Sequence, residues 1–233
     1  MKINMHHQPR KPSRDSLMSP NIRILLTGAL QFLLGALLSA GICWLYHFSF
    51  AHPIAIESWV ENIQETFLLI CAALFACAAR RNPRLAGGLW LISGFCASLF
   101  IRELDALFDL ITHGFWKYVL IVFLCLLSTL VARAGRDTIL PGLADFVSSR
   151  SFMLMLPGVV IILVYSRLYG FKGLWEHFSA CSNWGSFKSF SEEATELLGY
   201  ALMLSSALHY AFGRVWRRIR ALDPADVSDE RGA

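Results

Sequence analysis

Residues Trp59 to Ala79 read WVENIQETFLLICAALFACAA, a stretch that begins with two carboxylates, Glu61 and Glu65, and continues as an apolar run. As an α-helix rising about 1.5 Å per residue, this stretch is long enough to cross a hydrocarbon core of roughly 30 Å. Because residues four apart share one helix face, Glu61 and Glu65 are predicted to lie side by side at one membrane boundary. The stretch therefore predicts a membrane-spanning helix with an acidic end.

Five further stretches have a similar apolar character and length. They are residues 23–46, 85–107, 116–132, 152–170 and 190–212. In the whole chain 55% of the residues are hydrophobic and only 16% are charged, and the mean hydropathy is +0.50. This composition excludes an ordinary soluble domain. The predicted fold class is all-α, a polytopic membrane helix bundle with about six transmembrane helices.

The basic residues predict the orientation of this bundle. Of the 21 Lys and Arg residues, 16 lie in the terminal segments and in the loops around residues 80–84 and 133–150. Since basic loops favour the cytoplasm, both termini are predicted to be cytoplasmic and the acidic helix ends to face the opposite side.

Three parts of the chain follow from this topology. They are a mobile cytoplasmic N-terminal arm (1–22), a six-helix transmembrane domain (23–213) and a cytoplasmic tail, basic and then acidic (214–233). The basic residues of the tail are interpreted as a topology signal lying against anionic lipid. The lipid bilayer is therefore the expected partner, and no nucleic acid is expected.

Carboxylates gather at the same predicted end of the second, third and sixth expected helices. Acidic side chains at a membrane boundary are costly unless they are paired, hydrated or bound to a cation, so this cluster is a candidate functional site. The predicted catalytic residues are Glu65, Glu103 and Glu193. The predicted substrate- or cation-binding residues are Glu61, Arg102, Asp105, His113, Glu192 and Glu196.

The spacing of charges on the third expected helix predicts which of them meet. Arg102, Asp105 and Asp109 follow at i, i+3 and i+7 and share one face of a continuous helix, whereas Glu103 points roughly 100° away. Arg102 is therefore predicted to be the fixed counter-charge of the acidic pocket, paired with the acids of its own helix or of a neighbouring one.

The pocket is predicted to face the periplasm and to bind a cation or a lipid- or envelope-derived substrate. Hard divalent cations prefer Asp and Glu oxygens, so a divalent cation is a candidate cofactor whose identity stays open. If the protein is an enzyme, hydrolysis or transfer on a lipid or envelope precursor is expected, with one glutamate as general base. One alternative is a small-solute or ion transporter. The other is a structural or accessory membrane subunit without catalysis, in which the acids form only interhelical ion pairs.

Three motifs carry a resemblance to known sequences: Glu61-x-x-x-Glu65, Arg102-Glu103-x-Asp105, and Glu192-Glu193-x-x-Glu196. Together they resemble a pattern of uncharacterised bacterial polytopic inner membrane proteins, which implies a multi-pass location in the bacterial inner (plasma) membrane. A more distant likeness is to intramembrane metal hydrolases of the alkaline ceramidase type, whose paired helix histidines this chain lacks.

Overall fold

The described part of the protein is built from helices only. A computed structural model describes residues 57–176 and 184–221, together with isolated positions between 29 and 44, and these residues contain no strand. The chain divides into two units, Met1–His47 and Phe48–Ala233, and the fold below is that of the second unit. The predicted all-α class is confirmed for the described residues.

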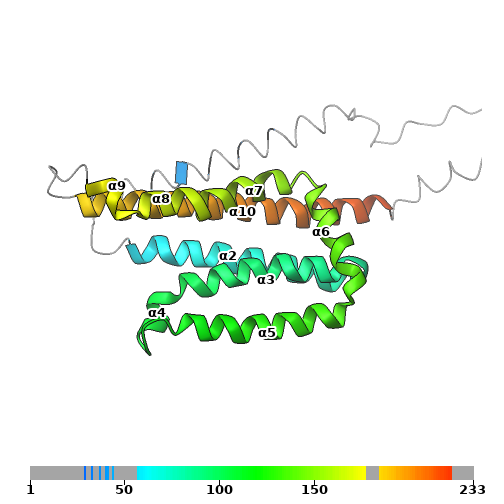
Figure 1. The fold of residues 1–233 in the computed structure, drawn as a ribbon. Helices are drawn as coiled ribbons and strands as arrows, with labels where there is room; N and C mark the ends of the chain where they lie inside the picture. Colours follow the sequence, from blue (N-terminus) through cyan, green and yellow to red (C-terminus); the bar gives the residue numbers. More distant parts are fainter. Residues whose placement is uncertain are drawn as a thin grey trace, which may run out of the picture. The chain divides into compact units, whose positions relative to one another are not determined.

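The helices follow one another with short connections (Figure 1). In chain order they are α2 (Glu57–Arg81), η2 (Pro83–Leu85), α3 (Ala86–Glu103), α4 (Asp105–Asp109), α5 (Trp116–Ala134), η3 (Arg136–Thr138), α6 (Ile139–Val147), α7 (Phe152–Val160), the π-helical segment η4 (Ile161–Ser166), α8 (Arg167–Gly170), α9 (Lys172–Glu176) and α10 (Trp184–Ala221).

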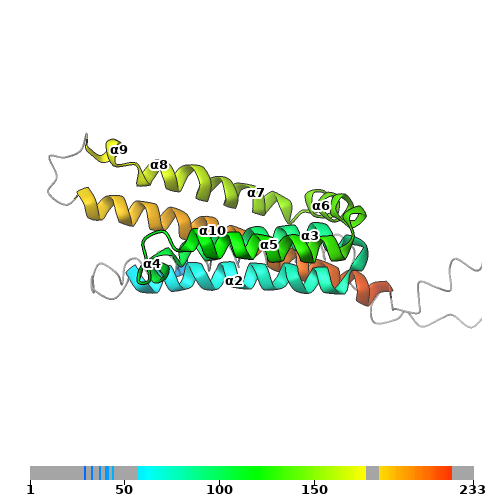
Figure 2. The same ribbon diagram turned by 60° about the horizontal axis from the view of Figure 1, so that its bottom comes forward.

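The long helices pack as a series of neighbours. Helix α5 packs on α3, α3 on α2, α2 on α10, and α10 on α7 and η4, while α6 lies across the start of α3. Figure 2 shows the same helices with α7 and α8 running alongside α10. Helices α2 and α10 therefore occupy the middle of the unit. The end of α2 that carries acidic residues lies close to the corresponding end of α10.

Four helical stretches are long and apolar enough to cross a membrane: Trp59–Arg81, Pro83–Glu103, Trp116–Ala134 and Phe152–Gly170. They correspond to the second to fifth expected spans, but the count of six is not confirmed. The first expected span (23–46) falls almost wholly outside the described residues. The sixth expected span (190–212) lies within α10, which is not among these four stretches.

The surface of α5 is apolar along most of its length. Its exposed large side chains are Tyr118, Ile121, Val122, Leu124, Leu126 and Leu130. Exposed apolar surface of this extent is rare on proteins that face only water. It suggests contact with a lipid bilayer.

Aromatic rings hold the end of the unit that carries α6. The Phe75 ring of α2 packs edge-on against Phe146 of α6, with 5.3 Å between ring centroids, and lies 5.6 Å from Tyr210 of α10. Phe146 also packs edge-on against Phe152 of α7, at 5.9 Å. Since aromatic pairs prefer such edge-to-face geometry, this cluster joins four helices in one packed contact.

Glycines allow α3 and α6 to approach closely. A Cβ atom on Gly88 would lie 2.4 Å from the backbone nitrogen of Leu143, and one on Gly142 would lie 2.4 Å from the carbonyl oxygen of Leu85. No side chain fits in either place, so the helices meet backbone to backbone. Residues 136–147 thereby cover the start of α3.

Candidate functional site

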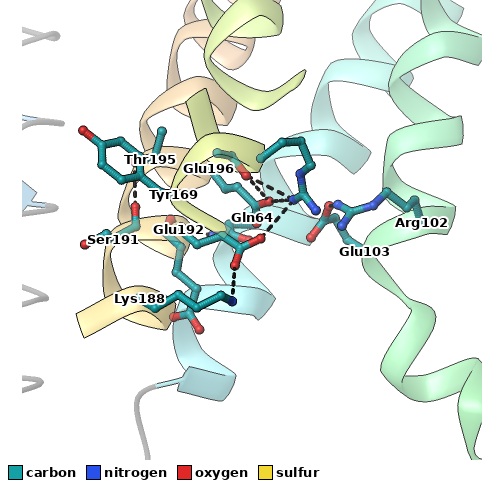
Figure 3. A network of polar contacts seen from close by, with 12 residues as sticks. Gln64, Arg102, Glu103, Tyr169, Lys188, Ser191, Glu192, Thr195 and Glu196 are labelled. Carbon is teal, nitrogen blue, oxygen red and sulfur yellow. Dashed lines mark hydrogen bonds and ion pairs between the residues drawn. The ribbon is translucent and has the colours of Figure 1, made fainter. Parts of the chain in front are cut away.

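A buried carboxylate, Glu196, lies at the centre of a charged network between α8 and α10. Its oxygen Oε1 accepts a 2.6 Å hydrogen bond from the hydroxyl of Ser166, which is fully buried. Nη2 of Arg167 donates to the same carboxylate oxygen and, at 3.1 Å, to the Ser166 hydroxyl. The three side chains thus form a closed set of contacts, and Figure 3 shows the dashed contacts that meet at Glu196.

The same arginine extends the network along α10. Nη2 of Arg167 lies 3.5 Å from Oε1 of Glu192, whose other oxygen is 3.2 Å from Nζ of Lys188. Glu192 therefore lies between two basic groups, one from α8 and one from its own helix. Figure 3 shows the ion pair between Lys188 and Glu192 on α10.

A second ion pair lies on α3 and also contacts α10. Arg102 and Glu103 form an ion pair, and the hydroxyl of Tyr200 donates a 2.7 Å hydrogen bond to Oε1 of Glu103. Tyr200 lies one helical turn after Glu196 on α10. The two groups of ion pairs consequently form one electrostatic cluster, which we call the charged cluster: Arg102, Glu103, Ser166, Arg167, Lys188, Glu192, Glu196 and Tyr200.

The sequence of α10 explains why four members of the charged cluster follow one another along the same side of the helix. Lys188, Glu192, Glu196 and Tyr200 are spaced four residues apart, and such residues are neighbours on a helix surface. Nearby, Nε2 of Gln64 on α2 donates a 3.2 Å hydrogen bond to the backbone carbonyl of Glu193. Helix α10 is therefore tied to α2 and α3 at the same level.

Ser166 and Arg167 reach the charged cluster from an irregular helix that comprises α7, η4 and α8. Pro157 lies inside α7 and has no N–H to donate to the preceding turn. The helix continues as the π-helical segment Ile161–Ser166 before α8 begins at Arg167. Such π-helical turns occur often at functional sites, and this one ends at the two residues that bind Glu196.

Within the ion pairs the carboxylate is more buried than its basic partner. Side-chain exposure is 8% for Glu196 against 47% for Arg167, and 13% for Glu103 against 34% for Arg102. Glu192 and Lys188 are nearly equal, at 21% and 25%. In the Arg167–Glu196 and Arg102–Glu103 pairs the basic side chain is consequently the more accessible of the two.

The structure brings together part of the predicted site. Glu103, Arg102, Glu192 and Glu196 belong to the charged cluster. Glu193 lies beside it and contacts Gln64 through its backbone carbonyl. Glu61 is exposed and Glu65 is half-buried on α2.

Asp105 lies just beyond a break in the third expected span. Helix α3 ends at Glu103, and α4 begins at Asp105 after Leu104, whose ψ angle is 13°. The predicted i, i+3, i+7 face assumed an unbroken helix, and it stays a prediction. The acid that forms an ion pair with Arg102 is its direct neighbour Glu103.

His113 belongs to a separate surface turn. Its side chain is 97% exposed, and its Nδ1 lies 2.9 Å from Oδ2 of Asp109. The other oxygen of Asp109 accepts a 2.8 Å hydrogen bond from the backbone N–H of Gly114, a residue whose positive φ of 78° favours glycine. These two hydrogen bonds hold the pKa of the Asp109 carboxyl below its usual range. The bond from Gly114 contributes more than the bond from His113.

This turn should lose a hydrogen-bonded contact in acid. A carboxyl whose pKa is depressed in the folded state stabilises that state above its unfolded pKa of about 3.9, and the contribution is lost as the pH falls through the folded pKa. We expect the Asp109 carboxyl to titrate below the ordinary range in a carbon-13 NMR titration, and the Gly114 amide to exchange faster at the same pH. An Asp109→Asn variant should show no such pH step, and titration of Asp109 at its ordinary pKa would contradict the assigned contacts.

The charged cluster is not arranged as a metal site in the described residues. No group of three or more His, Cys, Asp or Glu side chains among them is placed to hold a metal ion. Glu103, Glu192 and Glu196 each have a basic partner already. A cation at these positions would first have to displace an arginine or a lysine.

Arg167, Lys188, Ser166 and Tyr200 complete the cluster and were not among the predicted site residues. The spacing of Lys188 and Tyr200 from Glu192 and Glu196 was a usable signal, because all four fall on one helix face. No comparable signal places Ser166 and Arg167 against Glu196, since they approach it from another helix. Comparison of the chain with protein-family models, curated proteins and solved structures found no match.

Proposed function

We propose that this is an integral membrane protein, multi-pass in the bacterial inner membrane with cytoplasmic termini, whose charged cluster binds the anionic headgroup of a lipid or envelope-derived molecule. The proposal depends on one observation, the order of burial within the ion pairs. Glu196 and Glu103 are largely buried, while the side chains of their partners Arg167 and Arg102 are partly exposed. An approaching ligand therefore meets donors first.

The buried carboxylates have a positioning role in this proposal. Glu196 and Ser166 fix the guanidinium of Arg167, and Glu192 fixes both Arg167 and Lys188. A guanidinium has five N–H donors in a planar fork, so an arginine held by carboxylates on one side still has donors for a phosphate or carboxylate on the other. The predicted cation ligand is less favoured because it would have to compete with these basic groups.

A structural role is the second candidate. The hydrogen bond from Tyr200 to Glu103 joins α10 to α3, and the contacts of Glu196 join α10 to η4 and α8. These contacts alone would clamp the helices together, as expected for an accessory subunit without catalysis. The two candidates differ in what happens when the exposed bases are removed without leaving a buried charge unpaired.

Lipid binding by purified variants tests the proposal. We would titrate phosphatidylglycerol, with phosphatidylcholine as reference, into the protein in detergent and count bound lipids by native mass spectrometry. Lys188→Gln should weaken phosphatidylglycerol binding roughly fivefold, since a basic residue at a membrane surface contributes about 1 kcal/mol to binding of anionic lipid. Lys172→Gln is the matched control, because Lys172 is an exposed lysine of the neighbouring helix α9 that belongs to none of the described ion pairs.

A double variant, Arg167→Gln with Glu196→Gln, removes the guanidinium and the buried charge together. It should fold and lose phosphatidylglycerol binding if the cluster is a headgroup site. Unchanged binding in both Lys188→Gln and the double variant would reject the headgroup site and leave the structural clamp as the function of the cluster.

A further inference from the structure

A second group of polar side chains lies far from the charged cluster. His209 follows Glu196 on α10 by a helical rise of about 20 Å and contacts Ser151, the residue directly before α7. A hollow of about 270 Å³ lies there, lined by residues 148–151 and by His209 and Tyr210. This hollow shares no residue with the charged cluster.

The floor of the hollow is held in place by hydrogen bonds. Oγ of Ser151 lies 2.9 Å from Nδ1 of His209, and the Ser206 hydroxyl donates a 2.8 Å hydrogen bond to the Ser151 carbonyl. When the Ser151 hydroxyl donates to Nδ1, the imidazole carries its proton on Nε2. The ring is then oriented by one nitrogen and keeps a donor on the other.

The hollow has more positive than negative character. Arg150 is exposed at its edge, and within residues 57–176 and 184–221 no carboxylate is recorded as its ion-pair partner. Tyr210, which also lines the hollow, donates its hydroxyl to Asp145 at 2.7 Å. Asp145 is thereby held by a neutral donor.

Backbone donors add to this character. Residues 150 and 151 directly precede α7, which begins at Phe152, and the start of a helix presents unsatisfied N–H groups and a partial positive charge. Among the described residues, no backbone carbonyl accepts a hydrogen bond from the N–H of Arg150 or Ser151. Ser151 is only 1% exposed, and a buried N–H without an acceptor is rare in proteins.

We propose that this hollow binds a phosphate group, with Arg150 and His209 as side-chain donors and the backbone before α7 as a further donor surface. Guanidinium groups bind phosphate oxygens through paired N–H donors. Helix N-termini bind phosphate through their unsatisfied N–H groups and partial positive charge. The volume is below the roughly 300–1,000 Å³ of sites for drug-sized ligands, so a single small group fits better than a large molecule. The phosphate belongs either to a soluble phosphate ester or to a phospholipid headgroup.

Two arms of one experiment separate these sources. In the first arm, the full-length protein in phosphatidylcholine nanodiscs is titrated with inorganic phosphate in a calorimeter. In the second, phosphatidylglycerol is titrated into the detergent-solubilised protein and bound lipids are counted by native mass spectrometry. Phosphate binding in the first arm indicates a soluble ligand, and binding in the second arm alone indicates a headgroup.

Arg150→Gln should weaken binding roughly tenfold in whichever arm is positive, since a hydrogen bond to a charged group contributes about 1.5 kcal/mol or more. His209→Gln should weaken it in the same arm, and Arg133→Gln is the matched control, an exposed arginine at the end of α5. Because Arg150 is exposed, its replacement leaves the fold intact. Wild-type binding by Arg150→Gln, or no binding by the wild-type protein in either arm, would overturn the proposal.

Discussion

Replacing Arg167 with methionine is expected to lower the free energy of unfolding by about 3–5 kcal/mol, because it leaves a buried carboxylate without its counter-charge. The carboxylate is that of Glu196, whose side chain is only 8% exposed. After the substitution Ser166 still donates to Glu196, but a single hydroxyl does not neutralise the charge. Reversible unfolding in mixed detergent micelles measures the loss.

The reciprocal substitution should cost less. The Arg167 side chain is 47% exposed and can turn its guanidinium toward solvent or headgroups when Glu196 is replaced by glutamine. Adding Glu196→Gln to the Arg167→Met variant should therefore recover most of the lost stability, since the glutamine oxygen still accepts from Ser166. Lys172→Met provides the control for loss of a positive charge at the same end.

Equal losses in the single and double variants would show that packing of the Arg167 side chain, and not the unpaired charge, stabilises this region. A recovery in the double variant would instead show that Arg167 neutralises Glu196. The same double variant is then suitable for lipid-binding measurements, because its fold is preserved while the accessible guanidinium is gone.

The helices of this fold were predictable from the sequence because apolar runs of membrane-crossing length leave few alternatives. The expected spans 59–79, 116–132 and 152–170 differ from the observed stretches by two residues or fewer at each end. The expected end of the third span, at residue 107, lay beyond the observed helix end at Glu103. Hydropathy continues through Leu104 and Leu107, so composition alone could not locate the break.

The partners within the charged cluster were less predictable. The grouping of Glu192 and Glu196 follows from helical spacing, but their contact with Arg167 depends on how α8 packs against α10. That packing follows a π-helical segment after Pro157, a feature for which the sequence offers only the proline as a signal. The predicted catalytic roles of Glu65, Glu103 and Glu193 stay predictions, and so does the resemblance to bacterial inner membrane proteins.

Replacing Phe75 with alanine should destabilise the other end of the unit, by about 3 kcal/mol. Phe75 is 1% exposed and contacts Phe146 and Tyr210 with centroid distances of 5.3 and 5.6 Å. Large-to-small changes of a core phenylalanine cost about 3–5 kcal/mol in soluble proteins, of which part is the cavity left behind. The lower value is expected here because lipid tails are as apolar as the core, so lost packing contributes more than transfer from water.

An exposed apolar residue of the same helix provides the control for this measurement. Leu69 is 54% exposed, and Leu69→Ala should change the free energy of unfolding by less than about 1 kcal/mol, since surface substitutions usually have small effects. Unfolding by steric trapping in bicelles measures both variants under the same conditions. If Leu69→Ala cost as much as Phe75→Ala, the aromatic cluster would not be the contact that joins α2 to α6 and α10. A large loss confined to Phe75→Ala would show that the aromatic cluster joins α2 to α6 and α10, because Phe75 is the residue of α2 that contacts Phe146 and Tyr210.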